Sequence, residues 1–131
     1  KLRFTGQSRQ FFSADKLPVR LTVTKSAAGD VTSVVLDVAM ADYVEMATVN
    51  GRFNQSNHDA QISLLMSALE PLCDAIDPTL SKYKTEELEI DIRGCMRGRG
   101  NDSGFGDVAS IFVIRHNDGQ GESVSITFEP T

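Results

Sequence analysis

The residues best suited to chemistry lie in the last third of the chain, where Arg93, Arg97 and Arg99 bracket Cys95. Guanidinium groups favour a thiolate and bind carboxylate or phosphate through paired hydrogen bonds. A phosphatase loop, however, needs an arginine six positions after its cysteine, and Asn101 occupies that position. The cluster therefore predicts an anion-binding surface, or else an exposed face whose arginines form weak ion pairs with neighbouring acids.

The segment from Gly98 to Gly106 has the most unusual composition in the sequence, because it is rich in glycine. A dinucleotide-binding fingerprint would need glycine where Ser103 stands, and no lysine occupies a phosphate-loop position. A single calcium-binding repeat can be read in it, but such repeats work in tandem arrays. We expect a loop between two strands, in which Asn101 and Asp102 contact whatever the arginines bind.

His58 and His116 are the two histidines, and neither has a second His or Cys at metal-ligand spacing. His58 falls in the first turn of a predicted helix, where a capping or neutral role is expected. His116 ends a predicted strand beside a turn, and we group it with the arginines as a candidate ligand contact. The sequence predicts no metal, no cofactor and no catalytic residue.

An acidic ridge is the alternative partner surface. Four acids form it: Asp59, Glu70, Asp74 and Asp77. The segment 53–81 that holds them has no lysine or arginine, so it accounts for most of the net charge of −5. Asp74 and Asp77 would lie in the last turns of a helix, where an anion costs about 0.3 to 1 kcal/mol. Either Lys82 and Lys84 offset this charge, or a basic partner does.

The ridge belongs to a helix predicted from Ser56 to Asp77, in which apolar residues recur at spacings of three and four. They are Ile62, Leu65, Met66, Leu69, Leu72, Cys73 and Ile76. Pro71 lies inside this pattern and should kink or divide the helix. Pro78 should end it, because the residue before a proline is disfavoured in helical conformation.

Alternating apolar and polar residues predict five strands. Two form a hairpin, near 19–24 and 34–40, and three follow the helix, near 88–96, 108–116 and 124–128. A turn is also expected at Asn50-Gly51. The order ββαβββ predicts a single α+β domain over residues 1–131, with an antiparallel sheet of five or six strands, the sixth being N-terminal. One kinked amphipathic helix should cover one face and pack on Leu36, Leu88, Ile90, Val113 and Ile126.

The two cysteines are too few for a disulfide framework. Alternation in the strand predicted over 88–96 turns Cys95 away from the face on which the helix, and hence Cys73, would pack. We therefore expect two free thiols, which favour a reducing compartment and thus the cytoplasm. Residue 1 is Lys rather than Met, so a tag, a leader or a secretory signal could precede it, and a secreted or periplasmic location stays open.

Composition narrows the class of function. The chain has 131 residues, 40% of them hydrophobic and 24% charged, as in ordinary globular proteins. A pI near 4.9 argues against general nucleic-acid binding, and no apolar run reaches the roughly 20 residues that span a bilayer. We expect a non-enzymatic binding module, such as an inhibitor, immunity-like or accessory protein, whose partner is another protein or a second copy. The alternative is a small anion-binding domain or small enzyme that uses the arginine-bearing sheet face.

Overall fold

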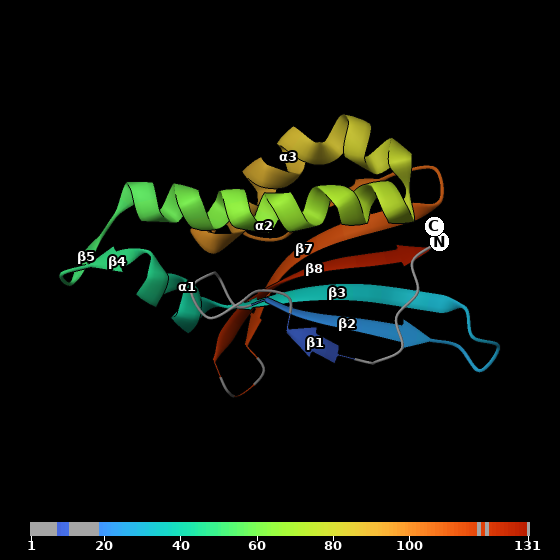
Figure 1. Ribbon diagram of the computed structural model, residues 1–131, viewed down its shortest axis with the longest axis horizontal. Coiled ribbons are helices and arrows are strands. Elements are labelled where there is room, and N and C mark those ends of the chain that lie inside the picture. Colours follow the sequence, from blue (N-terminus) through green and yellow to red (C-terminus); the bar gives the residue numbers. More distant parts are fainter. Residues whose placement is uncertain (1–7, 11–18, 118, 120, 131) are drawn as a thin grey trace.

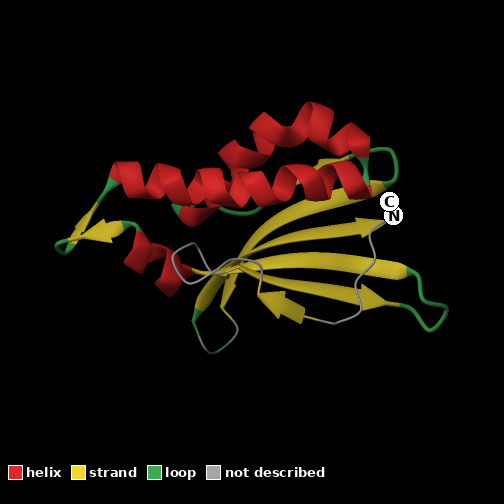
Figure 2. Ribbon diagram, viewed as in Figure 1, coloured by secondary structure: helices red, strands yellow, loops and turns green. Residues whose placement is uncertain are grey.

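The computed structural model of the chain is a six-stranded antiparallel sheet with two long helices on one face (Figure 1). It describes residues 8–10, 19–117, 119 and 121–130, and of 8–10 and 81–85 the backbone alone. The α+β class and the antiparallel sheet predicted from the sequence are confirmed. Figure 2 shows α2 and α3 together on the same side of the sheet.

The first and last parts of the chain meet at the centre of the sheet, where β3 lies beside β8. The strands of the sheet are β1 (Ser8–Gln10), β2 (Val19–Lys25), β3 (Val31–Ala39), β6 (Asp102–Phe105), β7 (Ala109–Asn117) and β8 (Glu122–Pro130). Their spatial order is β1-β2-β3-β8-β7-β6, so β3 pairs with the last strand along the chain. The predicted hairpin and the predicted strands near 108–116 and 124–128 correspond to β2, β3, β7 and β8.

Alternation along these strands separates a core face from an open face. On β3, Val34, Leu36 and Val38 are buried, and the residues between them are only half-buried. The same alternation on β8 buries Val124, Ile126 and Phe128 toward the helices. Because side chains alternate with a period of two, these strands need only one apolar face to form a core.

A short helix, α1 (Met40–Met46), follows β3 directly. A small two-stranded hairpin of β4 (Thr48–Val49) and β5 (Arg52–Phe53) then connects α1 to the long helices. Asn50 and Gly51 both have positive φ, at 51° and 75°, which is typical of the tight two-residue turns that join hairpin strands. This confirms the turn expected at Asn50-Gly51.

The predicted long helix is present as α2 (Gln55–Ile76). Its cap is Asn54, whose side chain accepts a hydrogen bond from the backbone N–H of Asn57 at 2.9 Å. Pro71 does not divide it, because α2 continues through this position. Its apolar stripe is buried as expected at Leu65, Leu69 and Leu72.

The strand predicted near 88–96 is wrong, because this segment belongs to α3 (Pro78–Met96). Leu88, Ile92 and Met96 are four residues apart and all buried, whereas Ile90, expected in the core, is 63% exposed. A short run of apolar residues can fit a strand and a helix equally well. Here the residues at a spacing of four are the ones buried, so the segment is helical. The loop expected over 98–106 is also partly wrong, because residues Asp102–Phe105 of this segment form strand β6. This strand takes the place in the sheet that was expected for the segment 88–96.

Asp77 ties the helical layer to the sheet. Its side chain caps α3: Oδ1 accepts from the Thr79 backbone N–H at 3.0 Å and from the Thr79 hydroxyl at 2.7 Å. Oδ2 accepts from the backbone N–H groups of Val108 at 2.8 Å and Ala109 at 3.1 Å, at the start of β7. Asp77 is only 1% exposed, so its place in the acidic surface predicted from the sequence is wrong.

Gly106 allows this approach of the β6–β7 turn to the helix junction. A Cβ at Gly106 would lie 2.4 Å from the Asp77 Oδ2 atom and 2.9 Å from both Leu80 Cγ and Thr79 Oγ1. No side chain fits there without moving the turn. Gly106 therefore serves the close contact of the β6–β7 turn with the side chains of Asp77, Thr79 and Leu80, which accounts for part of the unusual composition of this segment.

Replacing Asp77 should destabilise the fold strongly. Asp77→Ala leaves three backbone N–H groups without their acceptor, and we expect a loss of about 2 to 5 kcal/mol in the free energy of unfolding. Although burial acts to raise the pKa of Asp77, the hydrogen bonds from Thr79, Val108 and Ala109 hold it below 3.8. Its contribution is therefore complete above pH 3.8 and is lost as pH falls through the lowered pKa.

Urea unfolding checks this, with Glu70→Ala as the matched control because Glu70 is an exposed acid on α2. We expect the control to change the free energy of unfolding by less than about 0.5 kcal/mol. An Asp77→Ala variant as stable as this control would contradict a structural role for the carboxylate.

The two cysteines are free, as predicted, but not for the reason expected. Cys95 lies on α3 rather than on a strand, and both thiols belong to the same buried core. Burial raises the pKa of the Cys73 thiol to about 12 and also raises the pKa of the Cys95 thiol. Neither thiol is therefore poised to react.

Titration with a disulfide reagent should count both thiols in denaturant without added reductant. In the folded protein the reaction should be far slower, because burial hides each sulfur and keeps it protonated. Fast reaction of the folded protein, or recovery of a peptide pair that links Cys73 to Cys95, would contradict this arrangement.

Candidate functional site

A cavity of about 230 Å³ opens at the end of the molecule where α1 and the β4–β5 hairpin meet α2, at the left of Figure 1. Tyr43, Phe53 and His58 contribute rings to its wall. Arg97 and Arg115 also line it, and none of the described residues that line it is a carboxylate. The cavity is therefore apolar on one side and positively charged on the other.

Local folding brings these groups together. On α1, Met40 and Tyr43 are three residues apart and buried, so α1 turns the Tyr43 ring inward. The tight turn of the hairpin places the Phe53 ring 5.5 Å from the His58 ring, between ring centroids. The Tyr43 ring lies at the same distance in an edge-on arrangement. His58 is thereby 1% exposed at the first turn of α2.

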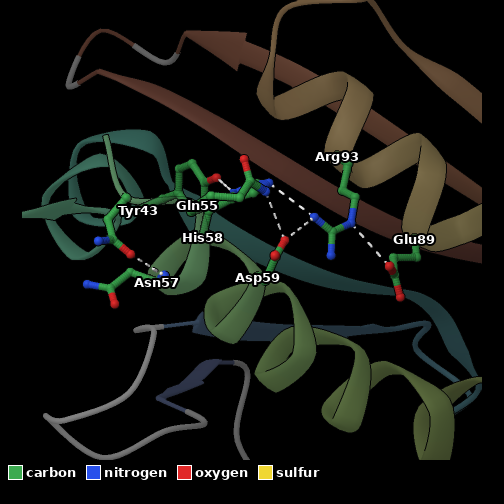
Figure 3. A network of polar contacts seen from close by, with 8 residues as sticks. Tyr43, Gln55, Asn57, His58, Asp59, Glu89 and Arg93 are labelled. Atoms are coloured by element: carbon green, nitrogen blue, oxygen red, sulfur yellow. Dashed lines mark hydrogen bonds and ion pairs between the residues drawn. The ribbon is translucent and has the colours of Figure 1, made fainter. Parts of the chain in front are cut away.

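A chain of polar contacts runs from Tyr43 across two helices, as Figure 3 shows. The Tyr43 hydroxyl is hydrogen-bonded to Nδ1 of His58, and the Nη1 atom of Arg93 lies 3.2 Å from Nε2 of the same ring. Arg93 Nη1 also donates to Asp59 Oδ1 at 2.8 Å, and Arg93 Nε donates to Glu89 Oε2 at 3.1 Å.

His58 is held neutral in this setting. Burial is the main cause that lowers its pKa, and the positive charges of Arg93 and Arg97 lower it further, against a smaller opposing effect of Asp59. The ring serves as a hydrogen-bonding group at neutral pH and carries no charge.

The predicted arginine cluster does not form one strand face. Arg93 and Arg97 are four residues apart at the end of α3, with Arg93 engaged in ion pairs and Arg97 at the cavity. Arg99 lies past the helix, packed near Gly94. The side chain of Asn101 accepts from the backbone N–H of Arg115, and that of Asp102 from the backbone N–H of Ser103.

His116 is separate from the arginines, on the open face of the sheet. Its Nε2 atom lies 2.6 Å from the hydroxyl of Ser125, which in turn donates to the carboxylate of Asp37. Asp37 and Ser125 are register partners on β3 and β8. The structure therefore does not bring His116 together with Arg93, Arg97 and Arg99 around one ligand.

The acidic ridge is also divided. Asp59 is paired with Arg93 of α3, an internal partner that the sequence analysis did not predict. Hydrogen bonds from Arg93 and Gln55 hold the pKa of Asp59 below its ordinary value. Glu70 and Asp74 remain exposed on α2. The side chains of Lys82 and Lys84, expected to offset this charge, lie outside those described.

Three residues of the cavity escaped sequence reasoning. Tyr43 falls in a segment of ambiguous pattern, His58 was expected only at a helix start, and no spacing links the two. Arg115 lies on β7, where its guanidinium donates to the Met96 carbonyl at 3.0 Å and holds Glu122 through two hydrogen bonds.

The sequence did contain one signal for the start of α3. Proline is favoured as the first residue of a helix, and Pro78 is the first residue of α3.

Among the described residues, no group of His, Cys, Asp and Glu is arranged to hold a metal ion. No helix in the described part of the chain is long and apolar enough to cross a membrane. Comparison of the chain with protein-family models, with curated proteins and with solved structures found no match.

The stability of the protein should depend on pH through His58. Its folded pKa lies below the ordinary value of 6.5, so the unfolded chain binds the proton more readily. The stabilisation is complete above pH 6.5 and is lost as pH falls from there through the lowered pKa. We expect the free energy of unfolding to drop between pH 7.5 and pH 5, and His58→Gln to remove that part of the drop.

His116→Gln is the control, because it removes the other histidine of the chain. The two variants are compared by the slope of the free energy of unfolding against pH. A uniform loss of stability in either variant leaves this slope unchanged. An unchanged slope in His58→Gln would contradict a buried neutral His58.

Proposed function

We propose that the protein is a non-enzymatic binding module that docks a segment of a partner protein at the cavity end of the molecule. One observation carries the proposal. Three exposed apolar residues gather there: Val44, Val49 and Phe53, with exposed fractions of 52%, 41% and 59%. Val44 and Phe53 line the cavity, and Val49 belongs to the same hairpin as Phe53.

This combination is typical of interaction surfaces. Exposed apolar groups that cluster beside a pocket mark binding sites, and aromatic residues and arginine carry much of the energy of protein interfaces. The volume of about 230 Å³ is smaller than the roughly 300 to 1,000 Å³ typical of small-molecule sites. It suits one anchoring side chain or chain end better than a complete small ligand.

Charge complementarity favours one kind of partner segment. Arg52 is exposed on the hairpin, Arg97 is exposed at the cavity, and the described lining contains no acid. A segment that carries an apolar residue next to an acid matches this surface, whereas a basic segment would be repelled at the cavity.

The second candidate function is a small anion-binding domain. Arg97 favours it, since this guanidinium lies at the cavity and has no carboxylate partner among the described residues. In that case the exposed apolar residues around the mouth would contribute little to binding.

Selection from a library of displayed random peptides tests the proposal. We expect peptides with an acid beside an apolar residue to be enriched. Their affinity should fall at least about 10-fold, or about 1.4 kcal/mol, in Phe53→Ser. Phe105→Ser is the matched control, because Phe105 is exposed to a similar extent, 63%, on β6.

The outcomes separate the candidates. Failure to enrich any peptide, or equal losses in Phe53→Ser and Phe105→Ser, would contradict docking at this end. Analytical ultracentrifugation of the purified protein tests whether the partner is a second copy of the chain. A dimer whose population rises with protein concentration, and which Phe53→Ser abolishes, would identify the partner in this way.

A further inference from the structure

The protons of the Tyr43–His58–Arg93 chain can be assigned from its hydrogen bonds. A guanidinium donates hydrogen bonds and cannot accept them, and its Nη1 atom carries two hydrogens. One points to Asp59 Oδ1 at 2.8 Å and the other to His58 Nε2 at 3.2 Å. Nε2 of His58 is therefore the acceptor, and the neutral ring must carry its proton on Nδ1.

This tautomer determines what Tyr43 does. The Nδ1–H of His58 donates to the Tyr43 oxygen, so the hydroxyl accepts that bond and retains its own hydrogen as a donor. No acceptor for that hydrogen occurs among the hydrogen bonds of the described residues. Tyr43 is 5% exposed and lines the cavity. A buried donor without an acceptor is unfavourable, and a ligand with an acceptor oxygen would relieve it.

The second donor is Arg97. Of the two arginines that line the cavity, Arg115 is held by both carboxylate oxygens of Glu122 and by the end of α3. Arg97 has no carboxylate partner within the described part of the chain. The described lining of the cavity thus has one free neutral donor, one positive charge without a carboxylate partner, and no acidic residue.

We infer that the cavity is a carboxylate-binding site, in which Tyr43 and Arg97 supply the hydrogen bonds and Phe53 and Met96 contact the apolar group that bears the carboxylate. The inference rests on the proposed function and names the anchor of the partner segment. A carboxylate matches the site because it has two acceptor oxygens and a single negative charge. A phosphate monoester carries about −1.5 to −2 at neutral pH, which exceeds the one positive charge without a carboxylate partner in the described lining.

The carboxylate could belong to a chain terminus or to an acidic side chain. N-acetyl-leucine carries the first, and the α-amide of N-acetyl-glutamic acid carries the second. N-acetyl-leucinamide has the same shape as N-acetyl-leucine but no charge, and inorganic phosphate is the competing anion. Each is titrated into the intact protein and followed by nuclear magnetic resonance.

We expect saturable binding of at least one of the two carboxylates, and at least 10-fold weaker binding of N-acetyl-leucinamide and of phosphate. The tighter of the two carboxylates identifies the source of the anchor. The inference would be overturned if neither carboxylate binds more tightly than N-acetyl-leucinamide, or if phosphate binds more tightly than both carboxylates.

Variants test the two donors separately. Arg97→Gln alters an exposed side chain and should weaken carboxylate binding at least 10-fold, whereas Arg99→Gln, outside the cavity, should leave it unchanged. Tyr43→Phe should weaken binding too, but it also removes the acceptor of the His58 proton. A direct measurement therefore accompanies it: the nitrogen chemical shifts of His58 should report a neutral ring protonated on Nδ1. Protonation on Nε2, or full binding by Arg97→Gln, would overturn the inference.

The two proposals fail in different ways. Displayed peptides that require Phe53 but bind equally well without any carboxylate would retain the docking surface and remove the carboxylate site. Binding of N-acetyl-leucine that requires Arg97, together with no enriched peptide, would retain the carboxylate site and remove the protein partner.

Discussion

The fold depends most on the carboxylate of Asp77, where the end of α2, the start of α3 and the entry to β7 meet. Its two oxygens accept four hydrogen bonds, three of them from backbone N–H groups. A buried carboxylate without such donors would be very unfavourable, so the helix junction and the β6–β7 turn must come together for Asp77 to be buried. Gly106 is the complementary constraint, because only a residue without Cβ fits against this carboxylate.

The same junction determines the geometry of the opposite end. Because α3 begins immediately after α2 ends, it turns back across α2 toward the N-terminal half of that helix (Figure 1). This is how Arg93 comes to contact both His58 and Asp59, which precede it by more than thirty positions. The cavity then needs only α1 and the β4–β5 hairpin to supply its outer wall.

The electrostatics of the cavity differ from those of the chain as a whole. The protein has a net charge of −5, yet the cavity combines a neutral histidine with two arginines. Each arginine of this region has a different task. Arg93 binds the two helices together, Arg115 joins the end of α3 to the sheet, and Arg97 is left at the opening. Arg93 and Arg97 are close in sequence, yet they do not act together on one ligand-binding site.

Local pattern alone determined a large part of this protein. The strands β2, β3, β7 and β8, the helix α2, the turn at Asn50-Gly51 and the α+β class follow from hydrophobic period and turn chemistry, which act over a few residues. The segment 88–96 could not be decided in this way, since its residues satisfy both periods, and burial of Leu88, Ile92 and Met96 in one core selected the helix. Tertiary structure alone decided that Asp77 is a buried cap and that Tyr43, His58 and Arg97 share a cavity. Contacts of this kind join residues distant in sequence, and their energy exists only once the chain has folded and excluded water from them.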